Sequence, residues 1–312
     1  MYRRMLVPLD GSELAEVVFP YASELAGRLG VEVVLLHISS PALREYVPMN
    51  RAYIEHAAEA VRREARKVQK KAGLVPEEKA VEVRGELVVG YPAEEILRYS
   101  EENAVDLILV ASHGRSGPKR WVLGSVAGKI LNAANIPVFL VRAGISEQIP
   151  YNEWPKRTII VPLDGSELAE SVLPHAEALS RQGGREMVTV ILVRVCEPPA
   201  MPSYYTPELA EIPLNWGQYA QQETARCKQV ATEYLAGIEP RFKNSGINVK
   251  SEVLVGKATD EIVAYANKTP YNLIVMATHG RSGLSRLVYG SVAANILVGV
   301  NSPLLLVKPT AK

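Results

Sequence analysis

The chain has 312 residues, of which 47% are hydrophobic and 22% charged, enough for two domains of ordinary size with real cores. The 35 Lys and Arg balance 34 Asp and Glu, and a formal net charge of +1 argues against a general nucleic-acid binder or a polybasic membrane protein. No apolar run reaches the roughly 18 residues that span a bilayer, and we expect no signal peptide at the first residues.

The chain contains two cysteines, Cys196 and Cys227, and their spacing matches no metal-ligand motif. Two cysteines in a chain of this length do not make the disulfide framework that holds small secreted domains together. The sequence therefore predicts no disulfide framework and a reducing, cytoplasmic setting.

The first half alternates strand and helix signals. Ser12 is a candidate N-cap, Gly30 and Gly73 end two of the helices, and Pro92 lies near the start of a third. Helical crossovers between short apolar strands are typical of a parallel sheet, so we expect a doubly wound α/β domain. The expected order is strand 5–9, helix 12–29, strand 31–38, helix 51–72, strand 81–89, helix 92–102, strand 106–111, helix 121–134 and strand 137–141.

The second half repeats the series. Residues 7–16 and 161–170 both read VPLDGSELAE, and residues 111–131 match residues 277–297 at 14 of 21 positions. The offset between the copies grows from 154 to 166 residues, which indicates an insertion in the Pro-rich stretch 197–216. Two long copies indicate a duplicated domain and not a solenoid.

A linker separates the two copies. The stretch 144–156 contains Gly144, Pro150 and Pro155, which is typical of a connection between domains. The sequence therefore predicts one domain over 1–143 and a second over 157–312.

Each copy contains three short segments at the edge where α/β sheets bind ligands. Each segment either follows a strand or begins a helix. In an open parallel sheet, ligands bind beyond the carboxyl ends of the strands, where the strand order reverses. The repetition indicates two similar sites. The segments are 10–12, 112–117 and 124–125, with counterparts at 164–166, 278–283 and 290–291.

The second and third segments predict a glycine-rich loop that enters a helix. Gly114, Gly117 and Gly124 allow close approach of the backbone to a ligand, and Ser125 adds a hydroxyl to the amide groups of a helix N-terminus. Such a loop suits a phosphate chain, because each charge-assisted hydrogen bond contributes roughly 1.5–3 kcal/mol. The alternative is a glycine turn with an ordinary capping serine. Repetition of the spacing at Gly280, Gly283, Gly290 and Ser291 favours phosphate binding.

The charged residues near these segments have two interpretations each. Asp10 and Asp164 are suited to accept hydrogen bonds from ribose hydroxyls, or to form an Asx turn or N-cap. The basic residues Arg115, Lys119, Arg120, Arg281 and Arg286 either neutralise phosphates or solvate the loop. We expect His113 and His279 to pack or to form hydrogen bonds rather than to act as bases.

Common catalytic motifs are absent from the sequence. It contains no G-x-x-x-x-G-K-[ST] loop, no G-x-S-x-G elbow, and no G-x-G-x-x-G fingerprint after the first strand. No metal-ligand spacing occurs in both copies, and no nucleophile is paired with a base. These absences argue against a Walker-type ATPase and leave catalysis a minor hypothesis.

The sequence resembles the universal stress protein family, in its tandem two-domain form, over nearly the whole chain. The features that carry the resemblance are the two VPLDGS segments, the LLHI strand end at 35–38 and the HGRSG…GS segments of both copies. The nucleotide-binding branch of that family has the motif G-x2-G-x9-G-[ST]. Both copies fit from its second glycine onward, with Ala111 and Ala277 at the position of the first glycine.

The resemblance implies a five-stranded fold of order 3-2-1-4-5 and pairing of the two copies through their last strands into an intramolecular pseudo-dimer. It also implies ATP, ADP or AMP as ligand, with Asp10 and Asp164 near the ribose and the backbone of Ile38 and Val195 near adenine. Mg²⁺ would be held through the phosphates. The implied cofactor-binding residues are Asp10, Ile38, Ala111, Gly114, Arg115, Gly117, Gly124, Ser125, Asp164, Val195, Ala277, Gly280, Arg281, Gly283, Gly290 and Ser291.

The sequence thus predicts a cytoplasmic, nucleotide-binding stress-response protein with two similar sites and no nucleic-acid or membrane partner. Formation of a homodimer stays open. Two alternatives also stay open: a dimerising scaffold that binds no nucleotide, and a slow ATP hydrolase or nucleotidyl-transfer enzyme of the same fold.

Overall fold

The computed structural model describes residues 2–74, 80–113, 123–143, 149–181, 187–200, 215–279 and 290–309. The elements of the first half are β1 (Arg4–Leu9), α1 (Glu13–Glu16), α2 (Phe19–Leu29), β2 (Glu32–Ser39), the 3₁₀ segment η1 (Pro41–Tyr46), α3 (Val47–Lys71), β3 (Val83–Val89), α4 (Pro92–Glu102), β4 (Leu107–Ala111), α5 (Ser125–Ala133) and β5 (Val138–Val141).

The second half repeats this order after the 3₁₀ segment η2 (Tyr151–Glu153). Its elements are β6 (Arg157–Pro162), α6 (Glu167–Glu170), α7 (Leu173–Ser180), β7 (Val188–Cys196), α8 (Trp216–Asn244), β8 (Asn248–Val255), α9 (Ala258–Lys268), β9 (Asn272–Ala277), α10 (Ser291–Gly299) and β10 (Leu304–Val307). The expected duplicated α/β fold is therefore confirmed.

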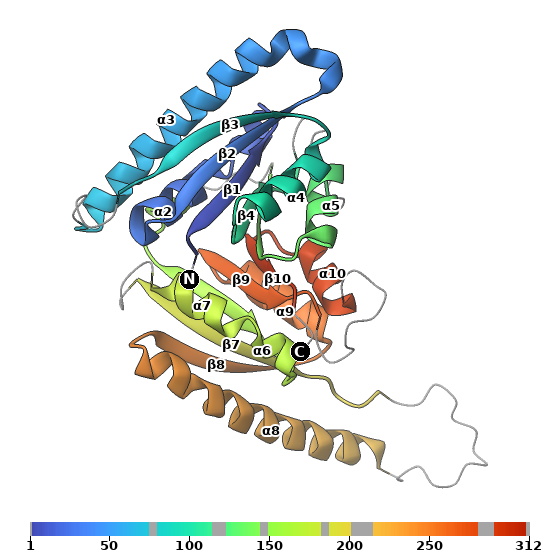
Figure 1. The fold of residues 1–312 in the computed structure, drawn as a ribbon. Coiled ribbons are helices and arrows are strands. Elements are labelled where there is room, and N and C mark those ends of the chain that lie inside the picture. Colours follow the sequence, from blue (N-terminus) through green and yellow to red (C-terminus); the bar gives the residue numbers. More distant parts are fainter. Residues whose placement is uncertain are drawn as a thin grey trace.

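The strands of the described chain form one continuous sheet in the order β3-β2-β1-β4-β5-β10-β9-β6-β7-β8. Each half has the expected order 3-2-1-4-5 with parallel neighbours, and α3 and α8 lie at opposite ends of the molecule beside β3 and β8 (Figure 1). The halves join where β5 and β10 pair antiparallel, with Phe139 opposite Leu305. This pairing produces the pseudo-dimer implied by the family resemblance.

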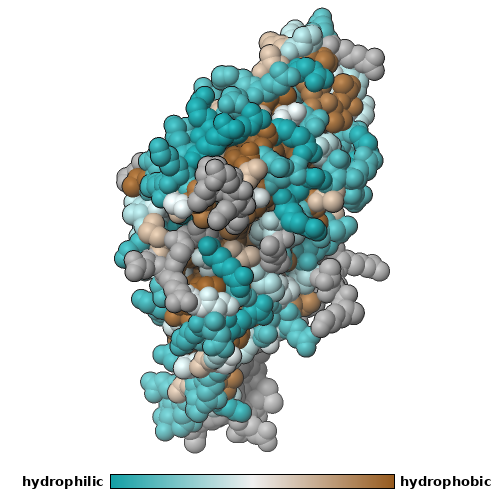
Figure 2. All heavy atoms as spheres, turned by 60° about the vertical axis from the view of Figure 1, so that its left-hand side comes forward, coloured by the Kyte–Doolittle hydropathy of each residue, from teal (hydrophilic) through white to brown (hydrophobic). Residues whose placement is uncertain are grey.

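The sheet separates two apolar cores, each of which runs through both halves. Helices α2, α3, α7 and α8 cover one face, and α4, α5, α9 and α10 cover the other. Neighbouring residues of a strand point to opposite faces, so Leu305 lies in the first core while Leu304 and Leu306 lie in the second. The face of the molecule seen in Figure 2 is mostly hydrophilic where it is coloured, with smaller hydrophobic areas between. Among the described helices, none combines the length and the apolar character required to cross a bilayer.

Side chains of the two halves also meet beside the central strands. The buried carboxylate of Glu24 on α2 lies 2.6 Å from Nη1 of Arg157 on β6, and it also pairs with Arg28. The hydroxyl of Tyr2 lies 2.7 Å from Nδ1 of His175 on α7. These contacts hold the halves in one orientation.

The expected helix over 12–29 is two helices. Ser12 is the N-cap of α1, as expected, and its side chain accepts a hydrogen bond from the backbone of Ala15. Pro20 lies in the first turn of α2 and has no N–H to continue the hydrogen-bond ladder from α1, so the chain turns between the helices. Gly30 ends α2 with a left-handed φ of +67°, also as expected.

Other boundaries shift by a few residues. Helix α3 begins at Val47, four residues before the expected start, because Pro48 is tolerated in the first turn. Helix α5 begins at Ser125, later than expected, and Gly124 precedes it in an extended conformation. Residues 121–122 of the expected helix lie outside the described residues.

The prediction of no disulfide framework is corrected by the structure. Cys196 at the end of β7 and Cys227 on α8 form a disulfide, with their Cα atoms 5.9 Å apart. The two residues are 31 positions apart in the sequence, and only the packing of α8 beside β7 brings them together. Spacing alone could not reveal this pair, because it follows from tertiary contact.

Candidate functional site

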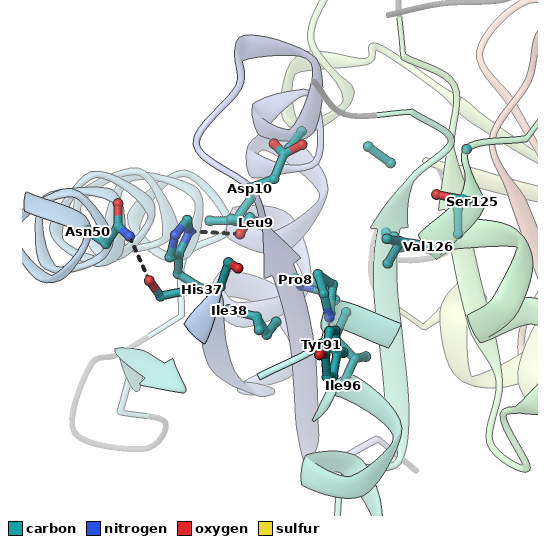
Figure 3. A pocket seen from close by; sticks show the side chains of 18 of the residues that line it. Pro8, Leu9, Asp10, His37, Ile38, Asn50, Tyr91, Ile96, Ser125 and Val126 are labelled. Carbon is teal, nitrogen blue, oxygen red and sulfur yellow. Dashed lines mark hydrogen bonds between the residues drawn. The ribbon is translucent and has the colours of Figure 1, made fainter. Parts of the chain in front are cut away.

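A cavity of about 710 Å³ opens in the first half, where β1 and β4 lie side by side and the strand order reverses. Asp10, Ile38 and Ser125 come from three different segments and lie around this cavity (Figure 3). A second cavity of about 500 Å³ occupies the same place in the second half, with Asp164 and Ser291 in its lining. The duplication has therefore preserved two hollows at matching positions.

The first aspartate in each half orients a tight turn at the cavity edge. The backbone N–H and the hydroxyl of Ser12 donate to Oδ1 of Asp10 at 3.0 and 2.6 Å. Gly11 has a φ of +80°, which a residue with a side chain rarely adopts. The second half repeats the arrangement, with Ser166 donating to Asp164 at 2.9 and 2.6 Å. The Asx-turn interpretation is thus correct for both aspartates, and the carboxylates still line the cavities.

Across each cavity lies the N-terminus of a helix. Gly124 donates its N–H to the carbonyl of Ser112 at 2.9 Å, and Gly290 donates to Thr278 at the same distance. A Cβ on Gly124 would lie 3.1 Å from the Ser112 carbonyl oxygen, so the strand end and the helix start approach closely. Among the described residues, no side chain caps α5 or α10, and the first turns of both helices line the cavities. Amide groups at such ends attract anions.

The residue two positions before the end of the second strand differs between the halves. In the first half, His37 is buried, its Nδ1 lies 3.0 Å from the Leu9 carbonyl oxygen, and its ring packs edge-on against Tyr53. In the second half, the guanidinium of Arg194 stacks 4.6 Å from the ring centre of Tyr234. Arg194 lines the second cavity together with Glu197, whereas His37 lines the first, so the two cavities differ in the charged side chains of their linings.

Each of these tyrosines holds its helix against the short helix after the first strand. Tyr53 on α3 donates to Glu16 at 2.9 Å, and Tyr234 on α8 donates to Glu170 at 2.8 Å. Burial and the hydrogen bond to Glu170 raise the pKa of Tyr234, so its hydroxyl stays a donor at neutral pH. The matching contacts make Tyr53 and Tyr234 equivalent positions.

The histidines before the glycine-rich loops are buried and hydrogen-bonded, as expected. Nδ1 of His113 lies 3.1 Å from the hydroxyl of Ser112, and Nδ1 of His279 lies 3.1 Å from that of Thr278. Both histidines line their cavities. Within the described part of the chain, Nε2 of His113 has no hydrogen-bond partner.

Sequence reasoning missed the outer rim of the first cavity. Tyr46, Met49 and Tyr91 line it and are 45%, 62% and 68% exposed. They come from η1, α3 and the start of α4, and no motif connects them. The sequence offered one weak indication of this rim, namely large apolar side chains at positions outside the predicted core.

Ten of the sequence-predicted residues lie around the two cavities. The first cavity includes Asp10, Ile38, Ala111, Gly124 and Ser125, and the second includes Asp164, Val195, Ala277, Gly290 and Ser291. The other six, Gly114, Arg115, Gly117, Gly280, Arg281 and Gly283, lie outside the described residues. Among the described residues, no group of three His, Cys, Asp or Glu is placed to hold a metal ion.

A comparison with protein families decides the relationship of this chain. The model described as "Universal stress protein family" matches residues 1–142 and again residues 156–308. The chain belongs to the universal stress protein family. Both copies are therefore family members, as the sequence motifs predicted.

Curated relatives of this universal stress protein include single-copy and tandem proteins. It is 33% identical over 150 residues to universal stress protein YxiE of Bacillus subtilis, an alignment that covers 46% of this chain and 100% of YxiE. It is 22% identical over 309 residues to universal stress protein Rv2005c of Mycobacterium tuberculosis, which covers 97% of this chain and 96% of that protein. A crystal structure of a universal stress protein from Archaeoglobus fulgidus matches 98% of this chain and 96% of its own, at 20% identity and a TM-score of 0.57. The structural match supports the tandem fold.

Proposed function

We propose that the protein binds one adenine nucleotide in each half and that it acts in the stress response through these ligands. The observation that carries the proposal is the repeated pairing of an oriented aspartate with a helix N-terminus that follows a glycine, across a cavity at the strand-order reversal. Family membership supports the stress role and a cytoplasmic setting.

The chemistry of each wall matches one part of a nucleotide. A carboxylate accepts hydrogen bonds from two ribose hydroxyls, and the amide groups and hydroxyl at Ser125 or Ser291 suit phosphate oxygens. The strand ends at Ile38 and Val195 present backbone groups and apolar side chains to a base. Cavities of about 300–1,000 Å³ take ligands of this size, and both cavities lie in that range.

A Mg²⁺ ion would enter with the nucleotide. Mg²⁺ usually keeps several waters and takes few protein ligands. The acidic side chains of the linings are Asp10 in the first cavity and Asp164 and Glu197 in the second, and each already accepts a hydrogen bond within the protein. The phosphates and water would therefore supply most of its coordination, and Mg²⁺ without nucleotide should bind weakly.

Calorimetric titration of the full chain with ADP and with ATP tests the proposal, with mass spectrometry of any nucleotide released on denaturation. We expect saturation at about two nucleotides per chain. GTP serves as the control for recognition of the base. Folded protein that binds neither ATP nor ADP at low salt would refute the proposal and favour a dimerising scaffold. Phosphate release during the ATP titration would instead favour the slow hydrolase.

A further inference from the structure

The two halves attach the long helix to the second strand in different ways. In the first half, Nδ2 of Asn50 on α3 donates to the hydroxyl of Ser39, the last residue of β2, at 3.3 Å. In the second half, Cys196 is the last residue of β7, and it is bonded to Cys227 on α8. Ser39 and Cys196 are equivalent positions, two residues after His37 and Arg194. A covalent bond that can be reduced thus replaces a hydrogen bond.

Among the described residues, the disulfide joins the sheet to the part of α8 that has the least buried surface. The buried residues of α8 are Ala231, Leu235 and Phe242, and no residue from 215 to 230 is buried. Cys227 belongs to this exposed half of the helix, whereas Cys196 is only 1% exposed at the strand end. Apolar burial stabilises a helix in a protein far more than intrinsic propensity does, so opening the bond would release the first turns of α8.

The disulfide is connected to the wall of the second cavity in two ways. Cys227 itself lines the cavity, and Cys196 directly follows Val195, which also lines it. Cys227 and Tyr234 are seven residues apart on α8, two turns or about 10.5 Å along one face. Tyr234 stacks on Arg194, whose guanidinium would lie 3.2 Å from a Cβ placed on Gly165 in the aspartate turn. Movement of α8 therefore changes the wall beside Asp164.

We propose that the Cys196–Cys227 disulfide is a redox-sensitive link that sets the affinity of the second cavity for its ligand, while the first cavity is insensitive to redox state. This inference rests on the proposed nucleotide binding. Reduction by a dithiol transfers two electrons and two protons to the cysteine pair, and the dithiol becomes a disulfide. Attack falls on Sγ of the partly exposed Cys227, with Cys196 as the leaving thiolate, and the second thiol of the reductant then releases Cys227.

The first experiment titrates ADP into the full chain after treatment with diamide and, separately, with dithiothreitol. We expect two sites in the oxidised protein. In the reduced protein, one site keeps its affinity and the other weakens about tenfold, because a wall that was held in place must now be ordered on binding. The first cavity, which has no cysteine in its lining, is the internal control. Cys227→Ser should behave as the reduced protein under both treatments.

A second measurement reports on the link without any ligand. Hydrogen exchange followed by mass spectrometry should show faster exchange over 216–230 in the reduced protein, with no change in α3. Two alkylatable thiols in the diamide-treated protein, or equal exchange and equal ADP affinity in both states, would overturn the inference. If ADP binds neither cavity but hydrogen exchange still depends on redox state, the proposed function and the redox effect on ligand affinity are both refuted. The redox-sensitive attachment of α8 by the disulfide would still be supported.

Discussion

Replacing Asp10 with asparagine separates the two roles of this side chain. Oδ1 of Asp10 accepts two hydrogen bonds from Ser12, and an asparagine keeps one oxygen for that turn. The substitution removes the negative charge and the second carboxylate oxygen. If the carboxylate binds ribose hydroxyls, the turn survives and the ligand contacts weaken.

The magnitude follows from the type of hydrogen bond. A bond to a charged group contributes about 1.5–3 kcal/mol and a neutral bond about 0.5–1.5 kcal/mol, so each ribose hydroxyl loses about 1–1.5 kcal/mol. Two hydroxyls give about 2–3 kcal/mol, which corresponds to about 30–150-fold weaker binding. The second cavity keeps its own aspartate, Asp164, and its affinity should not change.

The matched control is Ser12→Ala, which removes the N-cap of α1 and the hydroxyl bond to Oδ1 of Asp10 but keeps the carboxylate and its hydrogen bond from the backbone N–H of residue 12. Loss of a serine cap costs about 1 kcal/mol of stability, so we expect ADP affinity within about threefold of the parent. The assay is ADP calorimetry on both variants, with circular dichroism to check folding. Equal affinity losses in the two variants would refute the ribose role, because the turn alone would then explain both.

Two further predictions concern stability. Glu24→Gln should lower the free energy of unfolding, measured in urea, by about 3–5 kcal/mol, because the buried charge of Arg157 then lacks its carboxylate partner. The control is Arg98→Ala, which breaks an exposed ion pair and should change the free energy of unfolding little. Burial lowers the pKa of His175 to about 4, so the unfolded chain takes up a proton that the folded protein does not. The free energy of unfolding should therefore fall as the pH drops from about 6.5 toward 4. A His175→Gln variant whose free energy of unfolding falls as steeply with pH as that of the parent would contradict this.

Much of the fold follows from local sequence patterns. The buried strands are continuous apolar runs, Ser12 and Gly30 supply a cap and a left-handed turn, and the repeat shows that the domain occurs twice. These signals depend on the conformational preferences of a few neighbouring residues. The split of the helix at Pro20 is equally local, because a proline has no N–H to continue a helix through its own position.

The motif residues of the candidate site could be predicted from the sequence, but the side chains that surround them could not. Asp10 and Ser125 stand next to strand and helix ends, so the sheet topology alone brings them to one cavity. The rim formed by Tyr46 and Tyr91 was not predictable, since these side chains come from separate elements whose approach depends on how the helices pack. The exchange of His37 for Arg194 was visible in the sequence, but its stacking on Tyr234 was not.

The sequence by itself determined the two-copy α/β fold, the helix caps and the residues at the strand ends, because short-range periodicity and turn chemistry encode them. Only the tertiary structure decided the Glu24–Arg157 contact between the halves and the Cys196–Cys227 bond. Both join residues that are far apart along the chain, and their meeting depends on the packing of whole helices against the sheet. A disulfide in particular requires two Cα atoms within about 7 Å, a condition that spacing in the sequence does not express.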